Sequence, residues 1–239
     1  MSKFVKRKVS ELPAECFLEP VARQLSGLVE FRDEHIDLIR QSFRIWTHIF
    51  ARSHPEKVNI NIVLGSPARI NLAVCNPNSS FEIGDEASGS WNIVYFRQAH
   101  VKIGDRTTSN GVKVFADGGR LNVGADCMMS EDIVMHCGDN HAVIDMKTGK
   151  PLNSAPARIE IEDHVWVGAG ARIMGGAKIG KGCVVAAGAV VPGKSFEPCK
   201  LIAGNPARVR KSNVSWTRDV QGASWDAIRQ QYDLKVEDI

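Results

Sequence analysis

The segment Ile161–Phe196 reads IEDHVW VGAGAR IMGGAK IGKGCV VAAGAV VPGKSF, which is six successive blocks of six residues. Every block opens with a β-branched aliphatic residue, and its fifth residue is nearly always small. The fourth place is often glycine, which can take a positive φ without a Cβ clash. A helix would repeat near 3.6 residues and a half-buried strand at two, so this period of six predicts a parallel β-helix.

The same step continues upstream less regularly, through Val123, Met129 and Met135. Ile83-Gly84-Asp85 and Ile103-Gly104-Asp105 are predicted to be further rungs of the same helix. With three blocks to a triangular coil, residues 60–200 should form a prism of roughly six to eight coils. The step is interrupted at 89–100 and again at 142–157, and we interpret both stretches as inserted loops.

Three regions are expected along the chain. Residues 1–58 form an N-terminal, partly helical cap, because apolar residues over Leu18–Ala51 approximate a helical spacing and an open β-helix end leaves strand edges to cover. The β-helix domain occupies 59–211. The tail, 212–239, holds a short helix that begins at Ser224 with that serine as its cap.

Composition narrows the class of protein. The chain has 239 residues and a net charge of +3, too little to favour nucleic acid as a partner. It lacks the run of about 20 apolar residues that a membrane span needs. No apolar stretch follows the N-terminal lysines, so we expect no secretory signal. The six cysteines are scattered without a CxxC pair, which favours a reducing cytoplasm.

Residues able to carry chemistry gather where the repeat breaks, at Gly138–Asp145. His141 lies there, and a histidine with a pKa near 6.5 can take a proton from a hydroxyl at neutral pH. It could instead be a core histidine if the coil continued unbroken. Asp139 could orient His141 or serve as a turn residue. Cys137 as a nucleophile is the weaker reading, because the repeat accounts for its neighbours.

Aromatic residues have two interpretations each. Trp166 lies on an outward phase of the repeat and could belong to an active site or to a subunit interface. His164 is expected to be solvated or at an interface. Trp91 and Tyr95 could stack on a sugar ring, although buried anchors are the more usual case.

Three motifs carry a resemblance to a known family: Asp139-Asn140-His141 with Ile144-Asp145, the run Asp163–Gly168, and Ala203–Ala207 followed by Val214-Ser215-Trp216. Over about residues 100–217 the chain resembles the hexapeptide-repeat acyltransferases with a left-handed β-helix. It is most like the bacterial O-acetyltransferases of polysaccharide and capsule sugars. Two departures leave the acceptor open: Met174-Gly175-Gly176 stands where the family usually has a lysine, and Cys137-Gly138 where it often has serine or threonine.

The resemblance implies a homotrimer with active sites between neighbouring prisms, acetyl-CoA as donor, a sugar or polysaccharide hydroxyl as acceptor, direct transfer and no metal. By motif, His141 is the catalytic base, with Trp166 and Asp139 beside it. The CoA-binding residues implied are Gly168, Ala169, Gly188, Ala203, Gly204, Asn205, Pro206, Arg208 and Lys211. Further cations in the last coils are also candidates: Lys178, Lys181, Lys200 and Arg210.

Other functions fit the same fold. The enzyme could be an N-acetyltransferase of an amino sugar, or could acetylate a small antibiotic-like alcohol. More remotely, His100, His136 and His141 are spaced like the zinc ligands of the β-helix carbonic anhydrases, which need three protein ligands and an open position. A non-enzymatic assembly module is the remaining alternative, and it would not bind CoA.

Overall fold

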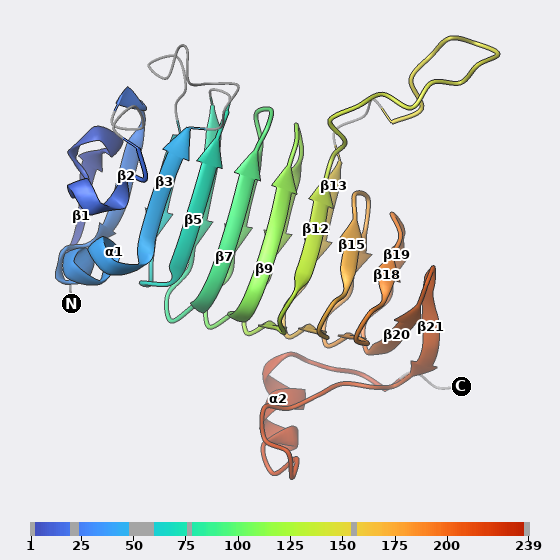
Figure 1. Cartoon of the computed structure of the whole chain (residues 1–239). Coiled ribbons are helices and arrows are strands. Elements are labelled where there is room, and N and C mark those ends of the chain that lie inside the picture. The colour runs from blue at the N-terminus through green and yellow to red at the C-terminus, as the bar shows by residue number, and fades with distance from the viewer. Residues whose placement is uncertain (1–2, 20–23, 48–59, 76–77, 154–156, 237–239) are drawn as a thin grey trace.

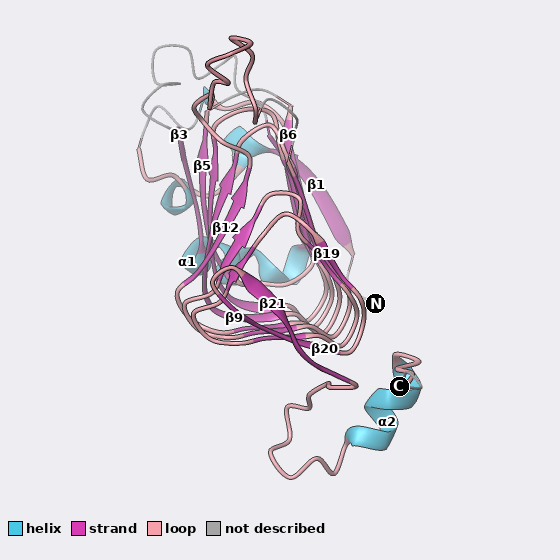
Figure 2. Ribbon diagram, turned by 90° about the vertical axis from the view of Figure 1, so that its right-hand side faces the viewer, coloured by secondary structure: helices cyan, strands magenta, loops and turns pink. Residues whose placement is uncertain are grey.

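The chain winds into a prism of stacked coils with a loop and a tail projecting from it (Figure 1). The structure is a computed structural model that describes residues 3–19, 24–47, 60–75, 78–153 and 157–236. Viewed along the prism, successive coils superpose around a closed outline (Figure 2). The fold is the all-β, left-handed β-helix of hexapeptide repeats that the sequence predicts.

Two sheets form the walls. The first has nine strands: β1 (Phe4–Lys8), β2 (Leu28–Arg32), β4 (Ile60–Leu64), β6 (Ser79–Ile83), β8 (His100–Ile103), β10 (Arg120–Val123), β13 (Arg158–Ile161), β16 (Lys178–Ile179) and β19 (Ser195–Phe196). The second has twelve: β3 (Phe43–Thr47), β5 (Arg69–Val74), β7 (Ser88–Tyr95), β9 (Thr108–Ala116), β11 (Met128–Met129), β12 (Ile133–Cys137), β14 (Trp166–Val167), β15 (Arg172–Met174), β17 (Val184–Val185), β18 (Val190–Val191), β20 (Lys200–Gly204) and β21 (Ala207–Ser212). The second sheet bends between two walls, because β9 pairs with both β11 and β12.

The repeat sets the register and the core. Glu160 pairs with Lys178 on the next coil, which is a step of three hexads. The residues that open the six blocks from Ile161 to Val191 are all buried, and the small residues Ala171, Ala177, Cys183 and Ala189 are buried between them. One large and one small inward residue per block therefore fill the narrow interior of these coils.

The coils upstream are longer, and the insertion predicted at 89–100 is wrong. Ser80 pairs with His100, and His100 with Arg120, so each coil takes twenty residues. Within that span β7 is a regular strand whose inward residues alternate as Trp91, Ile93 and Tyr95, all fully buried. Along β7 the buried residues therefore recur every two residues and not every six. Burial also excludes Trp91 and Tyr95 from stacking on a sugar.

The N-terminal region joins the β-helix instead of capping it with a long helix, which corrects the prediction over Leu18–Ala51. Helix α1 covers only Ile36–Ser42, with short 3-10 turns at Val9–Glu11, Ala14–Cys16 and Asp33–His35. β2 and β3 pair in parallel with β4 and β5, and β1 covers the outer edge of β2 in antiparallel fashion. Buried Val29, Phe31, Phe43 and Ile45 alternate as strand residues do. Residues 20–23 and 48–51 of the predicted helix lie outside the described residues.

The other end closes with a hairpin and a tail. β20 and β21 pair in antiparallel fashion, and the tail then leads to α2 (Trp225–Gln231), which lies beside the prism (Figure 1). The helix begins where predicted, but the Ser224 side chain makes no capping hydrogen bond. Among the described residues, no helix combines the length and the apolar character needed to cross a bilayer.

Candidate functional site

A loop leaves the prism at one corner and carries His141. It runs between β12 and β13 and projects beyond the coils (Figure 1). Arg120 still pairs in register with Arg158, so the loop is inserted without shifting the next rung. The chain leaves the prism at Gly138, before the predicted 142–157; φ of Gly138 is +111° and a Cβ there would lie 2.0 Å from the Asp117 carbonyl oxygen.

Asn153 ties the two arms of this loop together. Its Nδ2 donates to Asp139 Oδ2 at 2.8 Å and to the His141 carbonyl oxygen at 2.9 Å, while its Oδ1 accepts from the Val143 N–H at 2.9 Å. Sequence reasoning gave Asn153 no role, and only its place in a loop rich in turn residues marked it. The loop that holds His141 is therefore braced at its base.

His141 itself is exposed. The alternative of a core histidine is wrong, because the chain has left the prism three residues earlier. In this structure Asp139 bonds to Asn153 and makes no bond to the His141 ring among the described residues. The imidazole is thus open to a substrate at the rim of the loop.

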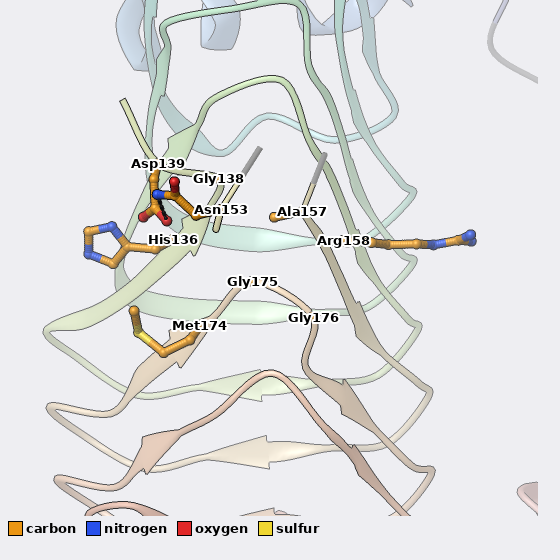
Figure 3. A pocket seen from close by; sticks show the side chains of 9 residues that line it. All are labelled: His136, Gly138, Asp139, Asn153, Ala157, Arg158, Met174, Gly175 and Gly176. Atoms are coloured by element: carbon orange, nitrogen blue, oxygen red, sulfur yellow. Dashed lines mark hydrogen bonds between the residues drawn. The ribbon is translucent and has the colours of Figure 1, made fainter. Parts of the chain in front are cut away.

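A hollow of about 460 Å³ lies beside the stem of the loop (Figure 3). It is lined by His136, Gly138, Asp139, Asn153, Ala157, Arg158, Met174, Gly175 and Gly176. Position 175 requires glycine for steric reasons, because a Cβ there would lie 2.6 Å from the Ala157 Cβ. His136 and Arg158 point to opposite sides of the prism. Gly175 therefore leaves room under the loop.

Trp166 points outward from β14, as predicted. Its Nε1 donates to Ser130 Oγ at 3.3 Å, and its ring lies 6.2 Å from that of Trp216. None of the contacts recorded for the described residues joins Trp166 to the His141 loop. Within one chain, the structure does not bring the two predicted catalytic residues together.

His164 is fully buried, which corrects the expectation that it is solvated or at an interface. Its ring is stacked between Trp216 at 4.4 Å and Tyr232 at 4.8 Å. Nδ1 lies 2.9 Å from Asp126 Oδ2 and Nε2 lies 2.9 Å from the Trp216 carbonyl oxygen. Each ring nitrogen of His164 is therefore within hydrogen-bonding distance of an oxygen. We call His164, Asp126, Trp216, Arg218 and Tyr232 the tail clasp.

The acidic member of the tail clasp has a shifted pKa. Burial raises the pKa of Asp126, but hydrogen bonding and charge from His164, with the charge of Arg218 and a bond from Tyr232, outweigh burial and bring it below its usual value. Arg218 also donates to Thr108 Oγ1 and to the Cys127 carbonyl oxygen. The clasp therefore joins the tail to the prism with ionic and aromatic contacts.

The predicted CoA-binding residues lie along a different corner from the loop. Gly168 and Ala169 follow β14, Gly188 follows β17 one coil later, and Ala203 to Pro206 form the end and turn of the final hairpin. The Gly188 N–H donates to the Ala169 carbonyl oxygen at 2.8 Å, so the corners stack directly. A Cβ on Gly188 would meet nothing within 4 Å, which leaves open space above this corner.

The basic residues singled out from the last coils differ in their exposure and in their partners. Arg208 and Lys211 are exposed on β21. Lys200 is buried with its Nζ 3.3 Å from Ser212 Oγ, Lys178 pairs with Glu162, and Arg210 donates to the Ala203 carbonyl oxygen. Of the cations singled out from the sequence, Arg208 and Lys211 have the most open positions for an anionic ligand.

Two rival chemistries gain no support from the geometry. Cys137 is buried, and burial raises the pKa of its thiol to about 12, so the nucleophilic thiolate is disfavoured. His100 bonds to Ser80 on the first sheet, whereas His136 stacks on Phe115 at 4.9 Å on the second. The described residues contain no group of three candidate metal ligands. One chain thus does not assemble the zinc site suggested by His100, His136 and His141.

Comparison with known proteins agrees with this architecture. A family model described as bacterial transferase hexapeptide (six repeats) matches residues 158–193. A polysialic acid O-acetyltransferase from Escherichia coli O1:K1 / APEC is 36% identical over 128 residues, covering 53% of this chain and 41% of that protein. One from Neisseria meningitidis is 27% identical over 165 residues, covering 67% and 76%.

A solved structure extends the likeness to three dimensions. The crystal structure of the polySia specific acetyltransferase NeuO superposes with a TM-score of 0.64 at 28% identity, covering 71% of this chain and 83% of that one. The chain spans less than half the length of the Escherichia coli relative. The chain therefore contains a bacterial transferase hexapeptide segment and is similar, over its β-helix, to polysialic acid O-acetyltransferases.

Proposed function

We propose that this protein transfers the acetyl group of acetyl-CoA to a hydroxyl of a sugar or surface polysaccharide, with His141 as the general base. The observation that carries the proposal is the exposed His141, on a loop braced by Asn153 beside an open hollow. The scaffold is similar to proteins named as sugar O-acetyltransferases, which supports the reaction class. Acetyl-CoA supplies an activated thioester.

His141 has one chemical task in this scheme. Its neutral imidazole removes the proton of the acceptor hydroxyl as that oxygen attacks the thioester carbonyl carbon, since a hydroxyl alone attacks poorly at neutral pH. The oxyanion needs donors, which backbone N–H groups of the glycine-rich corners can provide. The imidazolium then returns its proton to the departing thiolate. No acetyl-enzyme forms, and the buried Cys137 is not needed.

We propose further that the active protein is a homotrimer. The His141 loop and the corner of Gly168, Ala169 and Gly188 lie at different corners of one prism, so the donor held by one chain would meet His141 of a neighbour. Trp166 lies on β14, which ends just before Gly168, and its side chain would enter the site from the same chain that binds CoA. Asp139 lies in the same loop and could orient the His141 ring if its hydrogen bond to Asn153 were broken. Arg208 and Lys211 are proposed to face the phosphates of CoA.

The test is His141→Ala, with Lys147→Ala as a control in the same exposed loop. Loss of a general base typically costs about 10²–10⁴ in turnover, so His141→Ala should lose that much while its CoA affinity and oligomeric state stay unchanged. Lys147→Ala should behave as the parent protein. Near-normal turnover of His141→Ala would refute the mechanism. Failure of the parent to bind CoA would favour an assembly module, and faster reaction with an amino sugar would change the acceptor.

A further inference from the structure

Three basic side chains form a column on the outside of the first sheet. His100, Arg120 and Arg158 occupy the same position on β8, β10 and β13 and pair directly in register. Neighbouring strands lie about 4.8 Å apart, so the column spans roughly 10 Å along the prism. Arg120 and Arg158 are exposed, and His100 is half-buried. We call these residues the basic column.

The column is short of negative partners. Arg158 pairs with Glu160, but no ion pair or hydrogen bond of the Arg120 guanidinium is found among the described residues. His100 uses Nδ1 toward Ser80 Oγ at 2.9 Å, and its Nε2 faces no partner in the described part of the chain. Like charges directly opposite on neighbouring strands are unfavourable, so local packing gives no reason for this arrangement.

A second hollow, of about 340 Å³, lies against the basic column. It is lined by Gln98, His100, Gly118, Gly119, Arg120, Ala157 and Arg158, with no carboxylate. Gly119 allows the backbone of the neighbouring coil to approach closely at the bottom of this hollow, because a Cβ there would lie 2.4 Å from the Ala157 carbonyl oxygen. Ala157 and Arg158 also line the hollow that contains Asp139. The two hollows therefore flank the stem of the loop that carries His141.

We propose that the basic column is a subsite for the carboxylate of an acidic sugar in the acceptor chain, next to the residue that is acetylated. Planar guanidinium groups match a carboxylate with paired hydrogen bonds, and two of them at strand spacing favour an anion over a neutral sugar. The subsite rests on the proposed function, because it is the His141 loop that relates it to the reaction. A CoA phosphate is the other anion of the right chemistry, but the candidate CoA residues lie along another corner.

Binding and turnover of Arg120→Gln, Arg158→Gln and the double variant test this subsite, with Arg229→Gln on α2 as a control of equal charge loss. The acceptor probes are a sialic acid oligomer and the same oligomer with its carboxylates reduced to alcohols. We expect each single variant to weaken binding of the acidic oligomer roughly fivefold to tenfold, and the double variant more. The reduced oligomer should bind the parent and the variants equally, and added salt should weaken only the acidic interaction.

Several outcomes would overturn the subsite. Unchanged affinity of the double variant for the acidic oligomer is one, and equal binding of acidic and reduced oligomers by the parent is another. If the double variant instead loses affinity for CoA but not for dephospho-CoA, the column binds the cofactor's phosphate. Oligomer binding is measured separately from acetyl transfer. If the protein binds the acidic oligomer through Arg120 and Arg158 but transfers no acetyl group, the subsite stands and the proposed function is rejected.

Discussion

Replacing Trp216 with alanine should release the tail from the prism while leaving the coils folded. Trp216 stacks on His164 at 4.4 Å with an interplanar angle of 5°, and its Nε1 donates to the His164 carbonyl oxygen at 2.9 Å. It is only 6% exposed. Its removal would leave one face of a buried imidazole uncovered and one carbonyl oxygen without its donor.

The size of the effect follows from these contacts. A buried tryptophan covers about 150–250 Å², which at about 25 cal/mol per Å² gives an upper figure near 4–6 kcal/mol. The lost hydrogen bond adds about 1 kcal/mol. Measured Trp→Ala changes of about 3–5 kcal/mol lie in the same range. Because the tail is held by this one clasp and a small cluster around Tyr232 and Leu234, we expect the loss to appear as local opening.

Trypsin provides the assay, because Arg218 lies in the clasp and its guanidinium is held by Thr108 and Asp126. At about 1.4 kcal/mol per tenfold, a loss of about 3–5 kcal/mol should raise the open population by roughly 10²-fold to 4 × 10³-fold, and cleavage after Arg218 should accelerate by a similar factor. Hydrogen exchange of 212–234 should lose protection while that of β13–β18 does not. Trp91→Ala is the contrast, since Trp91 is buried inside the coils and its loss should destabilise the prism. Unchanged cleavage after Arg218 in Trp216→Ala would refute this account of the clasp.

The remaining predictions concern acid, thiols and glycine. Folding lowers the pKa of Asp126, so the stability that this carboxylate contributes is present above its ordinary pKa of about 3.9 and is lost as the pH falls through the lower folded value. Acid should therefore loosen the tail between about pH 5 and pH 2, which tryptophan fluorescence can follow. Asp126→Asn should remove that change. Burial raises the pKa of Cys127, Cys137 and Cys183 to about 12, so iodoacetamide at neutral pH should spare them in the folded protein and label half-buried Cys75 first, as mass spectrometry of peptides can show. Gly119→Ala should lower the melting temperature, because its Cβ would lie 2.4 Å from a backbone oxygen, whereas Gly111→Ala, with its nearest atom at 3.7 Å, should not.

The regular coils could be predicted because their sequence and their geometry share one period. Where each side of the prism takes one hexad, as from Ile161 to Phe196, position in the sequence specifies burial directly. Upstream the coils take twenty residues, and Trp91, Ile93 and Tyr95 alternate along a long strand. This alternation has no six-residue period, so the sequence pattern predicts an insertion at 89–100 where the structure has the strand β7.

Only some features of the candidate site leave a mark in the sequence. The break at Gly138 and the small residues at Gly168 and Gly188 are properties of the repeat and can be read from it. The clasp depends on contacts between residues far apart in sequence, such as His164 with Trp216 and Asp126 with Tyr232. No local pattern distinguishes a histidine that will be covered by a tail from one that faces water.

The insertion of the His141 loop at a corner has an evolutionary consequence. Since Arg120 and Arg158 pair as though the intervening residues were absent, a loop of another length or composition could replace this one with every rung still paired. Under the proposed function, changes in the loop could alter the acceptor, while the coils proposed to bind the donor would keep their sequence and their pairing. A lineage built on this scaffold can diversify at one corner without having to solve the folding problem again.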